Sequence, residues 1–343
     1  MRSCMDDTSL FQQLRIAVYE YGKLSKSIKR LYIQDLLESC KDPVTRQNAV
    51  EYTIRHFSAD PNRRPLILQQ DRYRRWLQKM PELAKLGQIG ELRISPEYFI
   101  DLLHAANAPC EQLSLLHIES PYNEKHHLSS WYEDDRLLTL KGPNHLVLEE
   151  LIKHQKHLEL CLDHPWWSSL KGLHLHSCPI ESKGMRALFV SPHMEHIRAL
   201  TLKHCELKRP LATNLVHALG PLPLAYLDLS DNALHPQFVE RFHAELFDNL
   251  TYLLVQNTGL NRGTFLQLCD GPGLRKLKVL DVTGNYFAPE FATQLPSKHS
   301  LQHLTRLHLP PTLEEHHQEV QRAFPNTNIL YTPSHIRLSK LDL

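Results

Sequence analysis

Histidine and cysteine are the residue types here that could bind a metal or act as bases and nucleophiles, and the chain has 23 histidines and seven cysteines. The closest groupings are His126-His127, the pair His154 and His157, and the run Glu314-Glu315-His316-His317. Zinc needs three or four ligands that converge on one point. Adjacent helical residues diverge, and His154 and His157 have no identifiable third ligand. We therefore expect no metal site and no cofactor.

Catalytic motifs are missing from the sequence. It contains no glycine-rich phosphate loop, no H-E-x-x-H and no G-x-S-x-G. The cysteines are far apart, without a C-x-x-C pair, which indicates reduced thiols in a cytosol-like compartment. We expect a non-enzymatic, cytoplasmic protein without catalytic residues. A protein exported without an N-terminal signal would look the same.

A leucine phrase recurs through the C-terminal two-thirds of the chain. It reads LKGLHLHSCPI, IRALTLKHCEL, LAYLDLSDNAL, LTYLLVQNTGL and LKVLDVTGNYF, and a sixth copy decays into Pro310-Pro311. The second leucine falls at Leu173, Leu200, Leu227, Leu253, Leu280 and Leu307, in steps of 26 or 27 residues. Each Leu-x-Leu predicts a short strand with both leucines inward, followed by a helical return. Looser copies predict strands around Leu92, Leu116 and Leu138–Leu140, with extra helix inserted before Leu173.

The phrase and its period resemble the leucine-rich-repeat superfamily, and most closely its ribonuclease-inhibitor-like class, over residues 89–332. The resemblance implies an α/β solenoid, a horseshoe with parallel strands on the concave face and helices on the convex face. It also implies a protein partner. Cys161-Leu162-Asp163 matches the C-x-D of bacterial leucine-rich-repeat ubiquitin ligases. In those proteins the motif lies in a catalytic domain beyond the repeats, so we expect a buried structural cysteine here.

Residues 1–88 lack the phrase and are expected to form an α-helical segment. Asp42-Pro43 predicts a capped helix with Val44, Val50, Ile54 and Phe57 on its apolar face. The simplest role is a cap on the first repeat. One alternative is an adaptor, or an injected bacterial effector, whose helices recruit a second protein. A less favoured alternative is nucleic-acid binding through Arg72-Tyr73-Arg74-Arg75-Trp76. Residues 333–343 are expected to form a tail.

The residues between the strand leucines predict the partner-binding surface. A net charge of +1 gives no global attraction to nucleic acid, and no apolar run is long enough to span a membrane. We expect a protein partner to bind the concave face, where Tyr226, Tyr252 and Leu254 should be exposed and act as anchors. The predicted site residues are His174, His176, Lys203, Tyr226, Asp228, Asp231, Tyr252, Leu254 and Asp281.

Overall fold

The computed structural model describes most of the C-terminal half of the chain and parts of the N-terminal half. The described ranges are 35–57, 66–69, 89–94, 115–119, 143–152, 169–180, 182–207, 222–234, 249–295 and 300–334, with single residues at 13, 33, 158, 162, 167, 219, 247 and 336.

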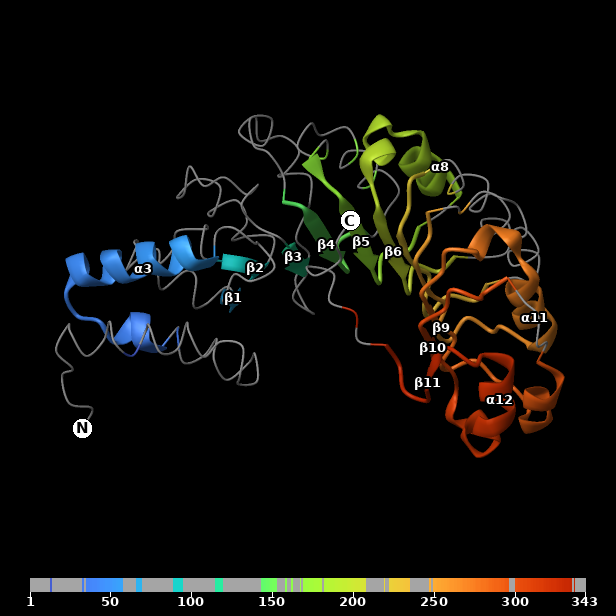
Figure 1. Cartoon of the computed structure of the whole chain (residues 1–343). Helices are drawn as coiled ribbons and strands as arrows, with labels where there is room; N and C mark the ends of the chain where they lie inside the picture. The colour runs from blue at the N-terminus through green and yellow to red at the C-terminus, as the bar shows by residue number, and fades with distance from the viewer. Residues whose placement is uncertain are drawn as a thin grey trace.

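One parallel sheet organises these residues (Figure 1). Its eleven strands lie in the order of the sequence, and each pairs in parallel with the next. Helices α8, α11 and α12 lie along one side of the sheet (Figure 1). The chain therefore has an α/β solenoid-like repeat architecture. The strands are β1 (Leu66–Gln69), β2 (Ile89–Ile94), β3 (Leu115–Glu119), β4 (His145–Glu149), β5 (Gly172–His176), β6 (Ala199–Lys203), β7 (Tyr226–Asp228), β8 (Tyr252–Leu254), β9 (Val279–Asp281), β10 (Arg306–His308) and β11 (Asn328–Leu330).

The second leucine of the phrase forms one continuous row across the sheet. From β5 to β10, each of these leucines pairs in register with the next. The row extends backwards through Leu146, Leu116, Leu92 and Leu68. The strand paired with β5 is β4, and the strand predicted at Leu138–Leu140 lies outside the described residues. Leu146 lies 27 residues before Leu173, the same step as in the later repeats.

A left-handed residue follows each strand from β4 to β9 with nearly the same period. These residues are Glu150, Ser177, His204, Asp231, Asn257 and Gly284, with φ from 49° to 72°. In this conformation their main-chain N–H groups reach the next repeat. For example, Ser177 donates to the Lys203 carbonyl at 2.9 Å and His204 to the Ser230 carbonyl at 3.1 Å. The turn therefore continues the inter-strand hydrogen bonding beyond the strand ends.

A small buried side chain bonds to the main chain beside the last five of these turns. Oδ1 of Asn232 accepts from the N–H groups of Cys205 (2.9 Å) and Leu207 (3.3 Å), and its Nδ2 donates to the Leu202 carbonyl at 2.6 Å. Asn285 bonds in the same way two repeats later. The equivalent positions hold Cys178, Cys205, Asn232, Thr258 and Asn285. Burying polar groups here is favourable because they are bonded.

The returns between strands are helical in part. The expected helices appear as α8 (Ser182–Val190) and α11 (Arg262–Asp270), where Asn261 and Thr264 form a reciprocal cap. The return expected to be a helix at PEFATQL is instead the 3₁₀ helix η12 (Pro289–Gln294). Most residues of the helices expected from ATNLVHAL and PQFVERFHAEL lie outside the described residues. The other elements are η8 (Pro192–His196), η11 (Pro272–Leu274), η13 (Pro311–His316) and α12 (His317–Ala323).

The N-terminal segment contains both a helix and a strand. Helix α3 (Pro43–Phe57) begins where expected, since Oδ2 of Asp42 accepts from the Thr45 N–H at 2.7 Å. Val44 is 67% exposed, so its placement on the apolar face is wrong; it lies in the first turn, and the buried side is formed by Ala49 and Val50.

The sheet begins before the boundary predicted at residue 89. β1 lies inside the segment expected to be wholly helical and pairs with β2, so that part of the prediction is corrected. The strand residues LILQ follow a proline at position 65 and are continuously apolar up to the glutamine, which suits a strand beside a partner. Residues 72–76, on which the nucleic-acid alternative depends, lie outside the described residues. Within the described part of the chain, no helix has the length and apolar character needed to cross a membrane.

Candidate functional site

From β2 to β10, the strands alternate core aliphatic side chains with side chains on the opposite side of the sheet, which we call the second face. On β5, Leu173 and Leu175 enter the core, while Gly172, His174 and His176 belong to the second face. The middle row of the second face, in register from β2 to β10, reads Arg93, His117, Val147, His174, Thr201, Asp228, Leu254, Asp281 and His308. Polar and aromatic groups from many repeats are thus brought together on one surface.

Two buried histidines form the centre of this face at β4 and β5. Nδ1 of His145 lies 3.1 Å from Nε2 of His174, and the rings stack with centroids 5.4 Å apart. Nδ1 of His174 is 2.8 Å from Oγ1 of Thr201 on β6. Gly172 makes room for the pair, because a Cβ there would lie 2.1 Å from Nδ1 of His145. Three strands are therefore joined by one side-chain network.

Burial holds these imidazoles neutral. It lowers the pKa of His145 to about 4, and nearby Lys171 acts in the same direction. Burial likewise lowers the pKa of His174 well below its usual value, with His145 and His176 contributing. Burial lowers the pKa of His176 to about 4, although Glu149 opposes the shift. Neutral imidazole rings suit this buried hydrogen-bonded network better than positively charged rings would.

His117 and Glu149 extend the network towards β3. Nε2 of His117 is 2.8 Å from Oε2 of Glu149, and the His117 ring meets the His176 ring edge-on at 6.4 Å. Two histidine pairs therefore lie side by side on neighbouring strands. Within the described residues, no group of three or more His, Cys, Asp or Glu side chains is placed to hold a metal ion.

A small apolar cluster occupies the second face at β6–β8. It consists of Ala199, Tyr226 and Leu254, and we call it the tyrosine cluster. The Tyr226 ring lies 6.1 Å from the Tyr252 ring and 6.4 Å from the His174 ring. Tyr226 is only 2% exposed and Leu254 only 4%, so the expectation that both are exposed is wrong. Tyr252 is half-buried. The neighbouring repeats pack these side chains against one another.

The tail, which we define as the described residues after β11 (331–334 and 336), also lies on this surface. It leaves β11 on the side of the sheet away from α12 (Figure 1). Ile336 packs against the tyrosine cluster. The Ser334 N–H donates to Oδ2 of Asp281 at 2.6 Å, and Nδ1 of His308 lies 2.6 Å from the Thr332 carbonyl. The second face therefore already binds an extended segment of its own chain.

Asp281 is wholly buried, and its carboxylate is fully engaged. Oδ1 accepts from the main-chain N–H and the hydroxyl of Thr283, at 2.9 and 2.7 Å. Oδ2 accepts from Nε2 of Gln256 at 2.7 Å and from the tail. Asp228 is also buried and accepts from the Ser230 N–H at 2.9 Å; burial raises the pKa of its carboxyl. Both acids support the sheet, and Asp281 also binds the tail.

Ser334, His308 and Asp281 are the residue types of a hydrolase triad, but their bonds differ from one. Nδ1 of His308 bonds to a main-chain carbonyl, so Asp281 does not orient the ring. Among the described residues, neither Oγ of Ser334 nor Nε2 of His308 has a hydrogen-bond partner. A triad requires the nucleophile to bond to the base and the base to the acid. In this arrangement Asp281 and His308 bind the tail, and they do not activate Ser334 as a nucleophile.

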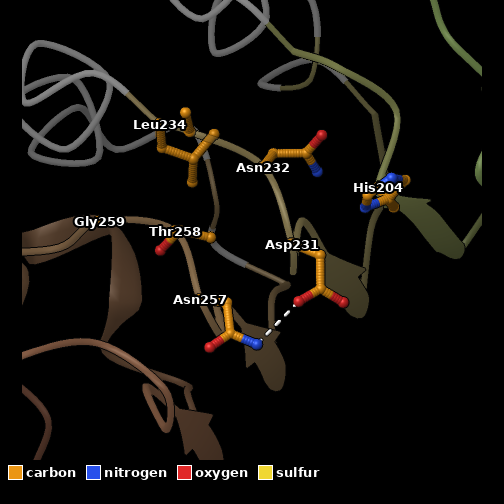
Figure 2. A pocket seen from close by; sticks show the side chains of 8 residues that line it. His204, Asp231, Asn232, Leu234, Asn257, Thr258 and Gly259 are labelled. Atoms are coloured by element: carbon orange, nitrogen blue, oxygen red, sulfur yellow. Dashed lines mark hydrogen bonds between the residues drawn. The ribbon is translucent and has the colours of Figure 1, made fainter.

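A shallow hollow of about 440 Å³ lies where strands β6–β8 end (Figure 2). Asp231 stands at its rim between two partners, since Nδ2 of Asn257 donates to its Oδ1 at 2.8 Å and Nζ of Lys203 lies 3.4 Å from its Oδ2. His204 and Gly259 also line the hollow. Lys203 and Asp231 are half-buried, so this edge presents accessible charges next to the tyrosine cluster.

The structure brings the nine predicted site residues onto one face or its rim, but it divides them by exposure. His176, Lys203, Asp231 and Tyr252 are half-buried, whereas His174, Tyr226, Asp228, Leu254 and Asp281 are buried. Sequence reasoning omitted His145, His308 and the tail from the site. The 27-residue step back from Leu173 to Leu146 would have placed His145 on the second face.

Among the other candidates from the sequence, those that the structure describes form no site. Cys178 and Cys205 are buried, and burial raises the pKa of Cys178 to about 11. Nδ1 of His317 bonds to the Tyr331 hydroxyl at 3.1 Å. His126, His127, His154, His157 and Cys161 lie outside the described residues.

Comparisons with known proteins add little. No protein family matches the sequence, and no curated protein sequence matches it. A crystal structure of a Bacteroides fragilis protein is similar at a TM-score of 0.39 and 16% identity, over 66% of this chain and 67% of that chain. A similarity this low indicates neither a family nor a function.

Proposed function

We propose that this chain is a non-enzymatic interaction scaffold of the leucine-rich-repeat type, in which the second face is the concave face and binds a protein partner. The row of leucines in register and the buried Asn/Cys positions support the repeat type. Three of the described cysteines, Cys178, Cys205 and Cys269, are free thiols, which suits a reducing, cytoplasmic location.

The observation that carries this proposal is the bound tail. An extended segment lies on the second face through main-chain hydrogen bonds and one aliphatic side chain. Strand addition at a sheet edge combines main-chain hydrogen bonds for affinity with side-chain contacts for specificity. The tail combines the main-chain groups of its own segment with side chains of the second face in a comparable way. The surface around the tail adds accessible charged and aromatic groups, which are common anchors of interfaces.

The half-buried side chains beside the tail are the predicted partner contacts. Tyr252 packs against the tyrosine cluster with part of its surface accessible. Lys203 and Asp231 hold each other in place at the strand ends. Because these groups are fixed by their neighbours, binding orders few additional side chains, and this favours affinity.

Site-specific photo-crosslinking in native lysate tests the proposal. A photoreactive residue is placed at Tyr252 or at Lys203 in the full chain, and the matched control places it at Val190, which is 75% exposed at the end of α8 on the helical side. We expect one protein to be captured at both second-face positions and not at Val190. Capture at position 252 that is lost in Lys203→Glu, together with capture at position 203 that is lost in Tyr252→Ala, would place the contact. Equal capture at Val190, or nuclease-sensitive capture, would contradict the proposal.

A further inference from the structure

The tail contacts the second face at alternate residues. The Thr332 carbonyl accepts from Nδ1–H of His308, since a carbonyl can only accept. Two residues later, the Ser334 N–H donates to Asp281, and two residues after that, Ile336 packs against the tyrosine cluster. This is the two-residue period of an extended chain.

The pattern of contacts defines what the surface recognises. The first two contacts use the main chain, so they accept any sequence that leaves a carbonyl at one position and an N–H two positions later. The third needs an aliphatic side chain four residues after that carbonyl. Position 333 makes no such contact, and Pro333, which has no N–H, is accommodated there. The surface thus selects an extended segment by one side chain and its spacing.

The tail is only partly buried against the second face. Thr332 and Pro333 are exposed, and Ser334 and Ile336 are only half-buried. Segments with few buried contacts open at low free-energy cost. In addition, Oγ of Ser334 and Nε2 of His308 are buried without a hydrogen-bond partner among the described residues. Unsatisfied buried polar atoms oppose binding, so the tail is not the best ligand that this surface could take.

We propose that the tail is an internal competitor for the second face, and that the partner is a protein presenting an extended segment with the same frame. This rests on the proposed function. The frame is a free main-chain carbonyl, a free N–H two residues on, and an aliphatic side chain two residues after that. Such a segment replaces each contact of the tail one for one, and the released tail no longer covers the tyrosine cluster.

Peptide binding to the full chain tests this competition. The probe is a fluorescent synthetic peptide of residues 329–343, and binding is followed by anisotropy. Two variants open the tail in independent ways: Ile336→Asp removes the apolar contact, and Ser334→Pro removes the donated N–H and places a proline ring against Asp281. We expect both to bind the peptide at least about tenfold more tightly than the wild-type chain, whose own tail competes. Thr332→Ala, which changes an exposed side chain and keeps the carbonyl, should bind as weakly as wild type.

Several outcomes would overturn the proposal. If both opened variants retain a cooperative unfolding transition and bind the peptide no better than wild type, the tail does not compete. If the same peptide carrying Asp in place of Ile336 binds the opened variants equally well, the second face does not recognise the aliphatic side chain. Concentration-dependent dimers of the wild-type chain that are lost in Ile336→Asp would assign the surface to a second copy.

The two proposals can fail separately. Capture of a protein at Tyr252, together with no peptide binding by the opened variants, would overturn the competition and leave the proposed function standing. Tight peptide binding by the opened variants, with no protein captured at Tyr252 or Lys203, would overturn the proposed function and leave the competition standing.

Discussion

Nδ1 of His145 and Nε2 of His174 face each other at 3.1 Å inside the sheet surface. A hydrogen bond between two ring nitrogens needs one N–H and one lone pair, so the pair can hold at most one excess proton. The other nitrogen of His174 is engaged by Thr201. The two rings therefore couple the packing of β4, β5 and β6 to their charge state.

Acid should destabilise the fold before carboxylates titrate. The folded-state pKa of His145 is about 4, and that of His174 also lies below 6.5. Their contribution to stability is fully present above about pH 6.5 and is lost as the pH falls from there towards 4, because the unfolded chain binds protons first. We expect His145 to account for a loss of up to about 2 kcal/mol at pH 5, and His174 to add to it in the same direction. Urea unfolding at pH 7.5 and pH 5 measures the loss.

Two substitutions separate this effect from general acid sensitivity. His145→Asn keeps a hydrogen-bonding atom near Nδ1 and removes the titration, so its stability should fall less between pH 7.5 and pH 5. His204→Asn changes an exposed histidine with φ of 53°, a conformation that asparagine tolerates. Its pH dependence should equal that of wild type. Identical slopes for wild type and His145→Asn would refute the assignment.

Two glycines should respond in opposite directions to alanine. A Cβ at Gly172 would lie 2.1 Å from Nδ1 of His145, so Gly172→Ala should destabilise the chain by about 1–3 kcal/mol through overpacking. At Gly263, inside α11, the nearest atom is Oδ1 of Asn261 at 3.4 Å. Gly263→Ala should therefore stabilise the chain by up to about 1 kcal/mol. Thermal unfolding of both variants measures these changes. A greater loss of stability in Gly263→Ala than in Gly172→Ala would contradict the packing described here.

The periodic phrase predicted the strands well where its spacing was regular. The strands from β5 to β10 follow from the leucine step, because each needs two inward leucines at fixed positions. β4 was missed because HLVLEELIKHQ contains leucines at both strand and helix periods, and the helical interpretation was preferred. β1 was missed because it has only four residues and no polar position follows it with the pattern of the later turns.

The sequence predicted the face of the sheet on which the candidate residues lie, but not how deeply their side chains are buried. Alternation along a strand gives the face on which Tyr226 and Leu254 lie. It does not give their burial, which depends on neighbours in other repeats and on Ile336. The tail contacts join residues as far apart as Asp281 and Ser334. No local pattern encodes such a contact.

The buried asparagines should be among the most sensitive polar residues. Asn232→Ala would leave the N–H groups of Cys205 and Leu207 and a carbonyl without their partner. Each buried group so left costs about 1–3 kcal/mol, so we expect a loss of at least about 2 kcal/mol in urea unfolding. Asn232→Cys introduces the residue type found at the equivalent positions 178 and 205, so it should lose less stability than Asn232→Ala. Asn257→Gly, at an exposed left-handed position, should change stability by less than about 1 kcal/mol.

The thiols of Cys178 and Cys205 should be inert in the folded chain. Burial raises the pKa of Cys178 to about 11 and that of Cys205 further, and only the thiolate reacts. Both sulfurs also donate to main-chain carbonyls, at 3.2 and 3.3 Å. At pH 8 we expect a maleimide to leave both unlabelled in native buffer and to label both in denaturant, as read by peptide mass mapping. The thiol introduced by Val190→Cys, at a position 75% exposed, should label at once in native buffer. Labelling of Cys178 at that same rate would mean that the strand ends open far more readily than the buried hydrogen bonds imply.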